Sequence, residues 1–251
     1  MSKTIHNQEP YYLAYEKRYS TVFSAGATHW GFTADNPWLI GTLTDWVDTN
    51  NLRGRRVLEF ACGEGAIGRI LSGLGCIWTG CDIAPSAVEK AKQATAAFPS
   101  AAVLRRDCVR EPMEGQFDAA IDVMGLHMII TDADRAGYLS HLTGSLREGA
   151  PVLFLHETYR ADAYTGTVAS IEEWGRISGS DYTTPQPRTI TTPGGQAEVM
   201  LPLLPARAKN LNGYTADFKE AGLTIEKFEP NGENVHCLYS ANFYTRYHVK
   251  A

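Results

Sequence analysis

The chain has 251 residues, 44% of them hydrophobic, and a formal net charge of −5, so it is long enough to bury the core of one enzyme domain. It contains no run of lysine and arginine, which disfavours nucleic acid as a partner because phosphate neutralisation needs clustered cations. The five cysteines are odd in number and lack Cys-x-x-Cys spacing, which predicts reduced thiols in a cytoplasmic protein: Cys62, Cys76, Cys81, Cys108 and Cys237.

At the start of the chain we expect neither a signal peptide nor a membrane span, because residues 1–7 are polar and the next segment is amphipathic. Within residues 8–32, tyrosines recur at three- and four-residue steps: Tyr11, Tyr12, Tyr15 and Tyr19. This spacing predicts a helix with an aromatic face, which carries Arg18 as its cation. Packing on the sheet accounts for such a face without any binding role.

Beyond this helix, apolar runs alternate with helical patterns, which predicts a mostly parallel sheet with helices on both faces. Strands are expected at 55–60, 77–82, 102–107, 117–124, 150–156, 223–229 and 236–247. Helices are expected at 36–49, 85–97 and 132–146, and another starts near Asn210. The last two strands, joined through Pro230, Asn231 and Gly232, predict a hairpin that places an antiparallel strand at or near the sheet edge.

A glycine loop follows the first predicted strand. Gly63 and Gly65 let the backbone pass close to a ligand, because glycine has no side chain and tolerates unusual dihedral angles. Asp82 ends the next strand, where its carboxylate can accept two hydrogen bonds from a ribose. The pattern therefore indicates a nucleoside site.

Two glutamates decide which nucleoside suits this loop. The loop also fits the Gly-x-Gly-x-x-Gly pattern of dinucleotide-binding folds. Glu64 lies inside the loop and Glu59 lies at the strand end before it, where their charges would repel a diphosphate. A cationic ligand with an ammonium and a sulfonium suits the same place, and S-adenosylmethionine is that ligand.

Glu59, Gly63 and Gly65 resemble the first motif, E/D-x-x-x-G-x-G, of the class I S-adenosylmethionine-dependent methyltransferases. The resemblance covers roughly residues 36–157 plus the C-terminal strands, with Gly149-Ala150 standing where the family usually has Gly-Gly. It implies a Rossmann-like α/β fold with a seven-stranded mostly parallel sheet whose last strand is antiparallel. The matching positions imply that Asp82 binds the ribose.

The same resemblance implies further contacts with S-adenosylmethionine. Asp107 would face the adenine amine, and we expect the cofactor site to include these residues: Glu59, Gly63, Gly65, Asp82, Ile83, Asp107, Cys108, Asp122, Tyr15 and Tyr19. An N-terminal helix often folds over the cofactor in this family, so residues 8–32 are a candidate lid. A tyrosine face near a sulfonium would gain from cation–π attraction.

Residues 158–209 form an insertion after the fifth strand, which we expect to fold as a substrate cap within a single domain. Its tyrosines, tryptophan and arginines suit a small planar, carboxylated or amino-acid-like ligand, although each arginine can equally be a solvated surface residue.

Chemistry is expected at the carboxyl ends of the fourth and fifth strands, where ligands bind in open α/β sheets. Methyl transfer is a direct displacement, so the protein mainly supplies alignment, sometimes with a base. The candidate catalytic residues are His127 as base, Asp122 and Tyr159. A metal site is not expected, because His156 and Glu157 point to opposite faces of a strand and lack a third ligand.

Several functions remain open. The first is methyl transfer to a small molecule, in bacterial specialised metabolism. The second is a cyclase in which the α-amine of S-adenosylmethionine attacks its own γ-carbon to form azetidine-2-carboxylate and methylthioadenosine. Residues 12–19 resemble the azetidine-forming enzymes of bacterial natural-product clusters, though not through a motif match. A non-catalytic S-adenosylmethionine sensor is the third, and a dehydrogenase is disfavoured by the two loop glutamates.

Overall fold

In the computed structural model, which describes residues 9–231 and 239–249, seven strands form one sheet in the order β3-β2-β1-β4-β5-β9-β8. The strands from β3 to β5 are parallel, while β9 runs antiparallel to both of its neighbours, β5 and β8. The predicted fold class is confirmed. A separate two-stranded sheet pairs β6 with β7 inside the insertion.

The elements have these bounds in chain order: η1 Tyr11–Leu13, α1 Ala14–Ser24, α2 Pro37–Thr49, β1 Arg56–Phe60, α3 Ala66–Gly73, β2 Ile77–Asp82, α4 Pro85–Thr95, β3 Ala102–Arg105, β4 Ala119–Val123, η2 Leu126–Met128, α5 Asp132–Gly144, β5 Pro151–Thr158, α6 Ile171–Ser178, β6 Gln186–Thr192, β7 Gly195–Leu201, α7 Leu211–Glu220, β8 Leu223–Asn231 and β9 Ser240–Tyr247.

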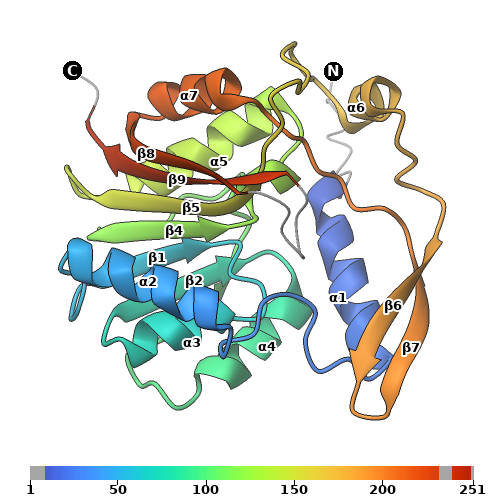
Figure 1. Cartoon of the computed structure of the whole chain (residues 1–251), viewed down its shortest axis with the longest axis horizontal. Helices are drawn as coiled ribbons and strands as arrows, with labels where there is room; N and C mark the ends of the chain where they lie inside the picture. The colour runs from blue at the N-terminus through green and yellow to red at the C-terminus, as the bar shows by residue number, and fades with distance from the viewer. Residues whose placement is uncertain (1–8, 232–238, 250–251) are drawn as a thin grey trace, which may run out of the picture.

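Two apolar layers enclose the main sheet. Helices α5 and α7 cover one face, and α2, α3 and α4 cover the other (Figure 1). On the first face, Phe154, Phe218 and Phe243 pack together with buried side chains of α5. On the second face, Leu43 and Trp78 belong to a layer built from α2, α3 and the strands. The sheet therefore presents its carboxyl edge, rather than either face, to a ligand.

The parallel register brings the ends of the central strands together. Phe60 of β1 pairs with Cys81 of β2 on one side and with Asp122 of β4 on the other. Residues that follow these positions therefore meet at one edge of the sheet, as the sequence predicts for Asp82 and the glycine loop.

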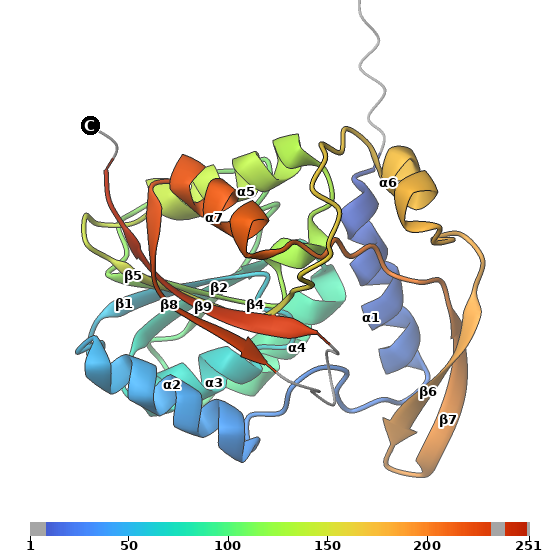
Figure 2. The ribbon, with the colours of Figure 1, turned by 45° about the horizontal axis from the view of Figure 1, so that its top comes forward.

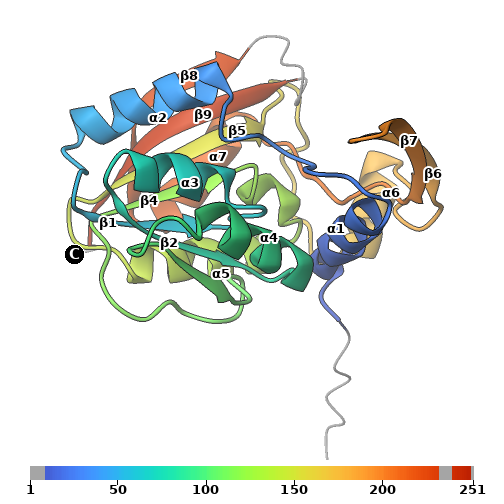
Figure 3. The same cartoon turned by 90° about the horizontal axis from the view of Figure 1, so that it is seen from below.

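The N-terminal helix and the insertion lie together beside that edge. Helix α1 stands next to the β6–β7 hairpin and α6 in two views (Figures 1 and 2), and the view from below shows the same grouping outside the main layers (Figure 3). Val22 of α1 packs in one apolar cluster with Ile190 of β6 and Val199 of β7. The N-terminal helix and the insertion thus pack together outside the main sheet.

The predicted elements differ from the observed ones mainly at their ends. The strand predicted at 117–124 is shorter in the structure, where β4 spans Ala119–Val123. The two residues before it make other contacts: the Asp118 carboxylate accepts a hydrogen bond from the Arg56 amide at 2.9 Å, and Phe117 forms an isolated bridge with Leu146. Helix α7 begins after Asn210, as predicted, and the side chain of Asn210 caps it by accepting a hydrogen bond from the amide of Gly213. Residues 1–7, residues 236–238 of the last predicted strand, Gly232 of the predicted hairpin turn and Cys237 lie outside the described residues.

Among the helices that the structure describes, none combines the length and apolar character that crossing a membrane requires.

Candidate functional site

A cavity of about 380 Å³ lies at the carboxyl edge of the main sheet, with residues of α1 on its other side. Its walls are formed by these residues: Tyr12, Tyr15, Arg18, Tyr19, Trp30, Gly31, Phe32, Glu59, Ala61, Cys62, Gly63, Glu64, Ala66, Ile67, Asp82, Ile83, Arg106, Asp107, Cys108, Val109, Val123, Met124, Gly125, Met128, Ile129 and Tyr138. Its size falls within the range of pockets that enclose one small ligand.

The glycine loop has the conformation that its sequence predicts. Gly63 and Gly65 have φ angles of 50° and 79°, a region that residues with a side chain rarely adopt. Gly63 lines the cavity, whereas Gly65 does not. A Cβ at Gly65 would lie 2.8 Å from the Cα of Ala91, so this glycine lets α3 and α4 approach each other. The two glycines therefore have different roles.

Asp82 holds the loop in place. Its Oδ2 accepts a hydrogen bond from the amide of Gly63 at 2.9 Å, and its Oδ1 accepts one from the amide of Ala84 at 2.9 Å. Burial raises the pKa of Asp82, while these two backbone hydrogen bonds lower it. The carboxylate lines the cavity together with the neighbouring Ile83.

Asp107 lies on the same side of the cavity, just beyond β3. Its two carboxylate oxygens each lie 3.0 Å from the hydroxyl of Tyr12, which donates to them, and Oδ1 also accepts from the amide of Val109 at 3.0 Å. Cys108 lines the cavity beside it. The hydrogen bond from Tyr12 holds the N-terminal segment against Asp107, the residue predicted to face the adenine amine.

The two glutamates that disfavour a diphosphate both line the cavity. Glu59 is 1% exposed and accepts a hydrogen bond from the indole of Trp78 at 2.8 Å. Burial raises the pKa of Glu59 well above its ordinary value. Glu64 accepts a hydrogen bond from the amide of Trp30 at 2.7 Å, and burial raises its pKa as well. A cation beside Glu59 would favour its charged form.

Helix α1 contributes a cation and aromatic rings to the cavity. Tyr15 and Tyr19 line it, and the hydroxyl of Tyr15 donates to the carbonyl of Pro205 at 2.7 Å, which ties the helix to the insertion. The guanidinium of Arg18 lies 3.8 Å from the ring centre of Trp30. Burial lowers the pKa of Arg18 to about 10. Across the described parts of the chain, Arg18 forms no ion pair with a carboxylate, and its buried Nε has no hydrogen-bond partner.

The predicted catalytic residues do not line the cavity. Asp122 is fully buried behind Gly125, where it accepts hydrogen bonds from the amide of Gly125 at 2.7 Å and from the hydroxyl of Tyr138 at 2.6 Å. Only Gly125 and Tyr138 of this group reach the cavity.

His127 is also buried, with its Nδ1 3.1 Å from Glu157 Oε2. Tyr159 packs edge-on against Phe228, with ring centres 5.3 Å apart. A role of Asp122, His127 or Tyr159 in catalysis stays a prediction, and in this structure each would act through neighbouring groups.

Sequence reasoning missed most of the apolar side of the cavity, apart from Trp30, which belongs to the predicted aromatic face of residues 8–32. The residues of this side come from the loop after α1 and from the end of β4 and the turn that follows: Trp30, Phe32, Val123, Met124, Met128 and Ile129. The sequence offers little signal for them, since lone aromatic and aliphatic residues in loops have no period. Within residues 9–231 and 239–249, no group of three histidine, cysteine, aspartate or glutamate side chains is arranged to hold a metal ion.

Residues 57–149 match a family model described as a methyltransferase domain. A comparison with curated proteins gave no match.

Solved structures resemble the chain over nearly its whole length. An S-adenosylmethionine-dependent methyltransferase from Clostridium acetobutylicum ATCC 824 superposes with a TM-score of 0.62 at 12% identity, covering 95% of this chain and 99% of that chain. The CcbJ methyltransferase from Streptomyces caelestis gives a TM-score of 0.66 at 14% identity, covering 93% and 99%. Magnesium protoporphyrin IX methyltransferase from Synechocystis PCC 6803, with bound S-adenosylmethionine, gives 0.61 at 15% identity, covering 96% and 99%. These likenesses show a shared fold.

Proposed function

We propose that the chain is an S-adenosylmethionine-dependent methyltransferase that acts on a small molecule. The observation that carries this proposal is the distribution of charge around one cavity. Asp82 ends β2, Asp107 follows β3, Glu59 and Glu64 lie at the glycine loop, and Arg18 of α1 lines the same cavity without an acidic partner among the described residues. A nucleoside joined to a zwitterionic amino acid and a sulfonium matches this arrangement.

Each part of S-adenosylmethionine has a group to receive it. Asp82 would bind the ribose hydroxyls, and Asp107 would face the adenine amine. The ammonium would lie near Glu59, and the carboxylate would pair with the guanidinium of Arg18, a charge-assisted contact that an arginine makes well. The aromatic rings of Tyr15 and Tyr19 would border the sulfonium, to which they are attracted through cation–π interactions.

The chemistry needs alignment more than it needs acid or base. The acceptor's lone pair attacks the methyl carbon, the bond between that carbon and sulfur breaks, and its electrons remain on the sulfur of the departing thioether. When the acceptor is a protonated nucleophile, its proton leaves. This chain's contribution is to hold the two reactants in line and to exclude water, which its aromatic and apolar walls favour.

We place the acceptor among small molecules of bacterial specialised metabolism. The support for this is the resemblance of residues 12–19 to enzymes of natural-product clusters and the size of the cavity, which suits a small molecule rather than a polymer. The apolar wall formed by Phe32, Met128 and Ile129 favours an acceptor with a hydrophobic part.

A second candidate function is cyclisation of S-adenosylmethionine itself. It is favoured by the absence of histidine among the described residues that line the cavity and by a volume close to the lower end of ligand pockets, about 300 Å³. In that reaction the unprotonated α-amine attacks the γ-carbon. The bond between that carbon and sulfur breaks, its electrons stay on methylthioadenosine, and the amine loses a proton.

One experiment separates these functions. Purified protein is incubated with S-adenosylmethionine alone and with added small-molecule extract, and the nucleoside products are followed by mass spectrometry. Adenosylhomocysteine that forms only with an acceptor supports methyl transfer. Methylthioadenosine formed without any acceptor, above the level in a protein-free control, replaces it with cyclisation. Binding of S-adenosylmethionine without either product indicates a sensor, and no binding refutes the cofactor assignment.

A further inference from the structure

Residues 126–130, here called the wall segment, follow β4. Side chains from other elements of the fold form hydrogen bonds with their backbone. Two of their side chains line the cavity, Met128 and Ile129. The amide of His127 donates to Glu157 Oε2 at 2.7 Å. The amide of Ile130 donates to the hydroxyl of Tyr11 at 2.7 Å. The position of the wall segment therefore depends on side chains from β5 and from the N-terminal segment.

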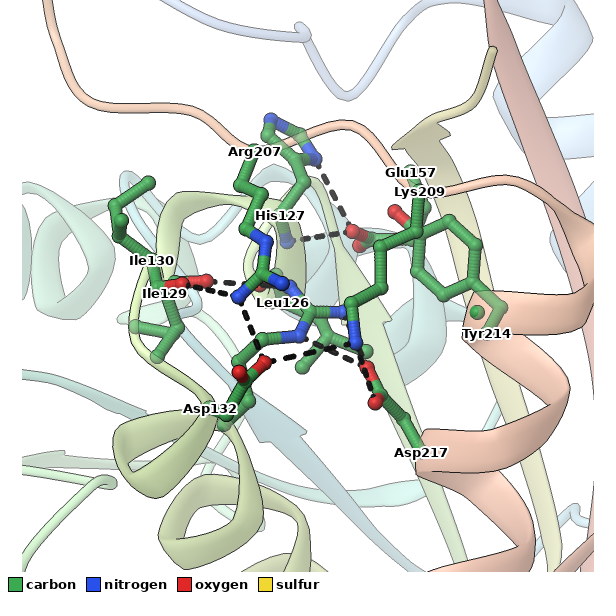
Figure 4. Close-up of polar contacts among 12 residues, drawn as sticks. Leu126, His127, Ile129, Ile130, Asp132, Glu157, Arg207, Lys209, Tyr214 and Asp217 are labelled. Carbon is green, nitrogen blue, oxygen red and sulfur yellow. Dashed lines mark hydrogen bonds and ion pairs between the residues drawn. The ribbon is translucent and has the colours of Figure 1, made fainter. Parts of the chain in front are cut away.

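Arg207, near the end of the insertion, holds the carbonyl side of the wall segment. Its Nη1 donates to the carbonyl of Ile130 at 2.7 Å and lies 2.7 Å from the carboxylate of Asp132 (Figure 4). The amide of Arg207 donates to the carbonyl of His127 at 2.8 Å. Its Nη2 donates to the carbonyl of Gly166, inside the insertion, at 3.0 Å. One residue thus joins the wall segment, the start of α5 and the interior of the insertion.

The charges around Arg207 form a cluster of three buried cations and two partly buried carboxylates. Arg207 is 2% exposed, and Lys209 is 8% exposed. The Nζ of Lys209 lies 2.5 Å from Asp217 and 4.0 Å from Asp132 (Figure 4). Arg135 pairs with Asp217 at 2.9 Å and also donates to carbonyls of the wall segment. Buried cations require such well-placed partners, so the cluster admits little movement of the groups that it joins.

We propose that Arg207 is a positioning residue, which fixes the wall segment and thereby the placement of the reacting groups in the cavity, although it does not line the cavity itself. The inference rests on the proposed function. A displacement of about 1 Å in a group that aligns reactants can slow a reaction roughly 100-fold. The acids proposed to anchor the nucleoside, Asp82 and Asp107, belong to β2 and to the turn after β3 and do not contact Arg207. Affinity for S-adenosylmethionine is therefore expected to depend on Arg207 much less than turnover does.

The test compares Arg207→Lys with the wild type and with Arg176→Lys, a matched change at an exposed arginine of the same insertion. Lysine keeps the charge that Asp132 requires but cannot reach both Ile130 and Gly166 as a planar fork does. Three quantities are measured: hydrogen exchange of the peptide that spans 126–130, the Kd for S-adenosylmethionine by calorimetry, and kcat and KM for nucleoside formation. If Arg207→Lys does not fold, Asp132→Asn loosens the same guanidinium and takes its place.

We expect Arg207→Lys to exchange faster at 126–130, to bind S-adenosylmethionine within about threefold of the wild type, and to lose roughly 100-fold in kcat. The Arg176→Lys control should match the wild type in all three. Unchanged exchange at 126–130 overturns the inference even if the wild type proves to have no turnover, so that result is separable from failure of the proposed function. Faster exchange with unchanged kcat, or parallel loss of affinity and kcat, overturns it as well.

Discussion

The buried carboxyl of Glu59 predicts that binding of S-adenosylmethionine releases a proton. Burial is the largest cause that raises the pKa of Glu59, and the nearby charges of Asp122 and Asp82 raise it further, against the hydrogen bond from Trp78. Without a cation beside it, this carboxyl holds its proton at a pH where an exposed glutamate is ionised. An ammonium next to Glu59 favours the carboxylate, so the two events are coupled.

Calorimetry in two buffers with different ionisation enthalpies, repeated at several pH values above the ordinary glutamate pKa, counts the released protons. We expect a wild-type count above zero and at most one per site. Glu59→Gln keeps the shape of the side chain and an oxygen for Trp78, but it has no proton to release and no charge for the ammonium. It should release no proton at this site and bind about 10- to 150-fold more weakly, since hydrogen bonds to charged groups contribute about 1.5–3 kcal/mol.

The same carboxyl sets a pH dependence of folding in the ligand-free protein. A folded pKa above the unfolded value means that the contribution of Glu59 to stability is complete below the unfolded pKa and is lost as pH rises through the folded pKa. The melting temperature of Glu59→Gln should therefore rise relative to that of the wild type as pH increases. Equal binding enthalpies in both buffers, together with parallel stability curves, would refute the reasoning.

Three further changes test the cavity. Asp82→Ala should cost about 1–3 kcal/mol of affinity for S-adenosylmethionine by calorimetry, because a charged ribose contact is lost, and unchanged affinity would remove Asp82 from the ribose site. Arg18→Met keeps an aliphatic stem but loses the guanidinium proposed to pair with the ligand carboxylate. This variant should therefore bind S-adenosylmethionine and its decarboxylated analogue with similar affinity. If it still prefers S-adenosylmethionine over the analogue as strongly as the wild type does, the pairing is contradicted. Gly65→Ala should lower the free energy of unfolding in urea by about 1–3 kcal/mol, because φ is 79° and the new Cβ would meet Ala91 at 2.8 Å, and an unshifted midpoint would show that α3 and α4 can relax.

The sequence predicts the parts of the site in which the same few residues both shape the backbone and carry the binding groups. A strand, a glycine turn and an acid at the next strand end fix one another's positions through short connections, so the sequence alone suffices to pair Gly63 with Asp82. Asp107 follows the same rule one strand later. The order of the strands and their helical crossovers is likewise a local consequence of alternating patterns.

The remaining parts depend on contacts between distant residues. The hydroxyl of Tyr15 reaches the carbonyl of Pro205, which is 190 residues away, and no spacing rule predicts that pair. The position of His127 near the end of β4 predicts a role in catalysis, but its side chain does not line the cavity. The short helix η2 instead directs Met128 into the cavity while His127 contacts Glu157. Position along the chain therefore predicts that this segment lies at the cavity, but it does not predict which of its side chains line the cavity.

The charged residues of the cavity fall into two groups, those bonded to the protein backbone and those proposed to bind the aminoacyl end of the ligand. Asp82, Asp107 and Glu64 accept hydrogen bonds from backbone amides of the protein itself, so these acids maintain the shape of the cavity. Arg18 is stacked on an indole and pairs with no acid in the described part of the chain, while Glu59 is buried under conditions that disfavour its charge. Such a cation and such a reluctant anion are both stabilised by one zwitterion, which is what the amino-acid end supplies. Methyl transfer permits the amine of that zwitterion to stay an ammonium, whereas cyclisation requires it to lose its proton. On the proposed placement we expect the carboxyl of Glu59 and the aromatic rings of the cavity to decide between these two states.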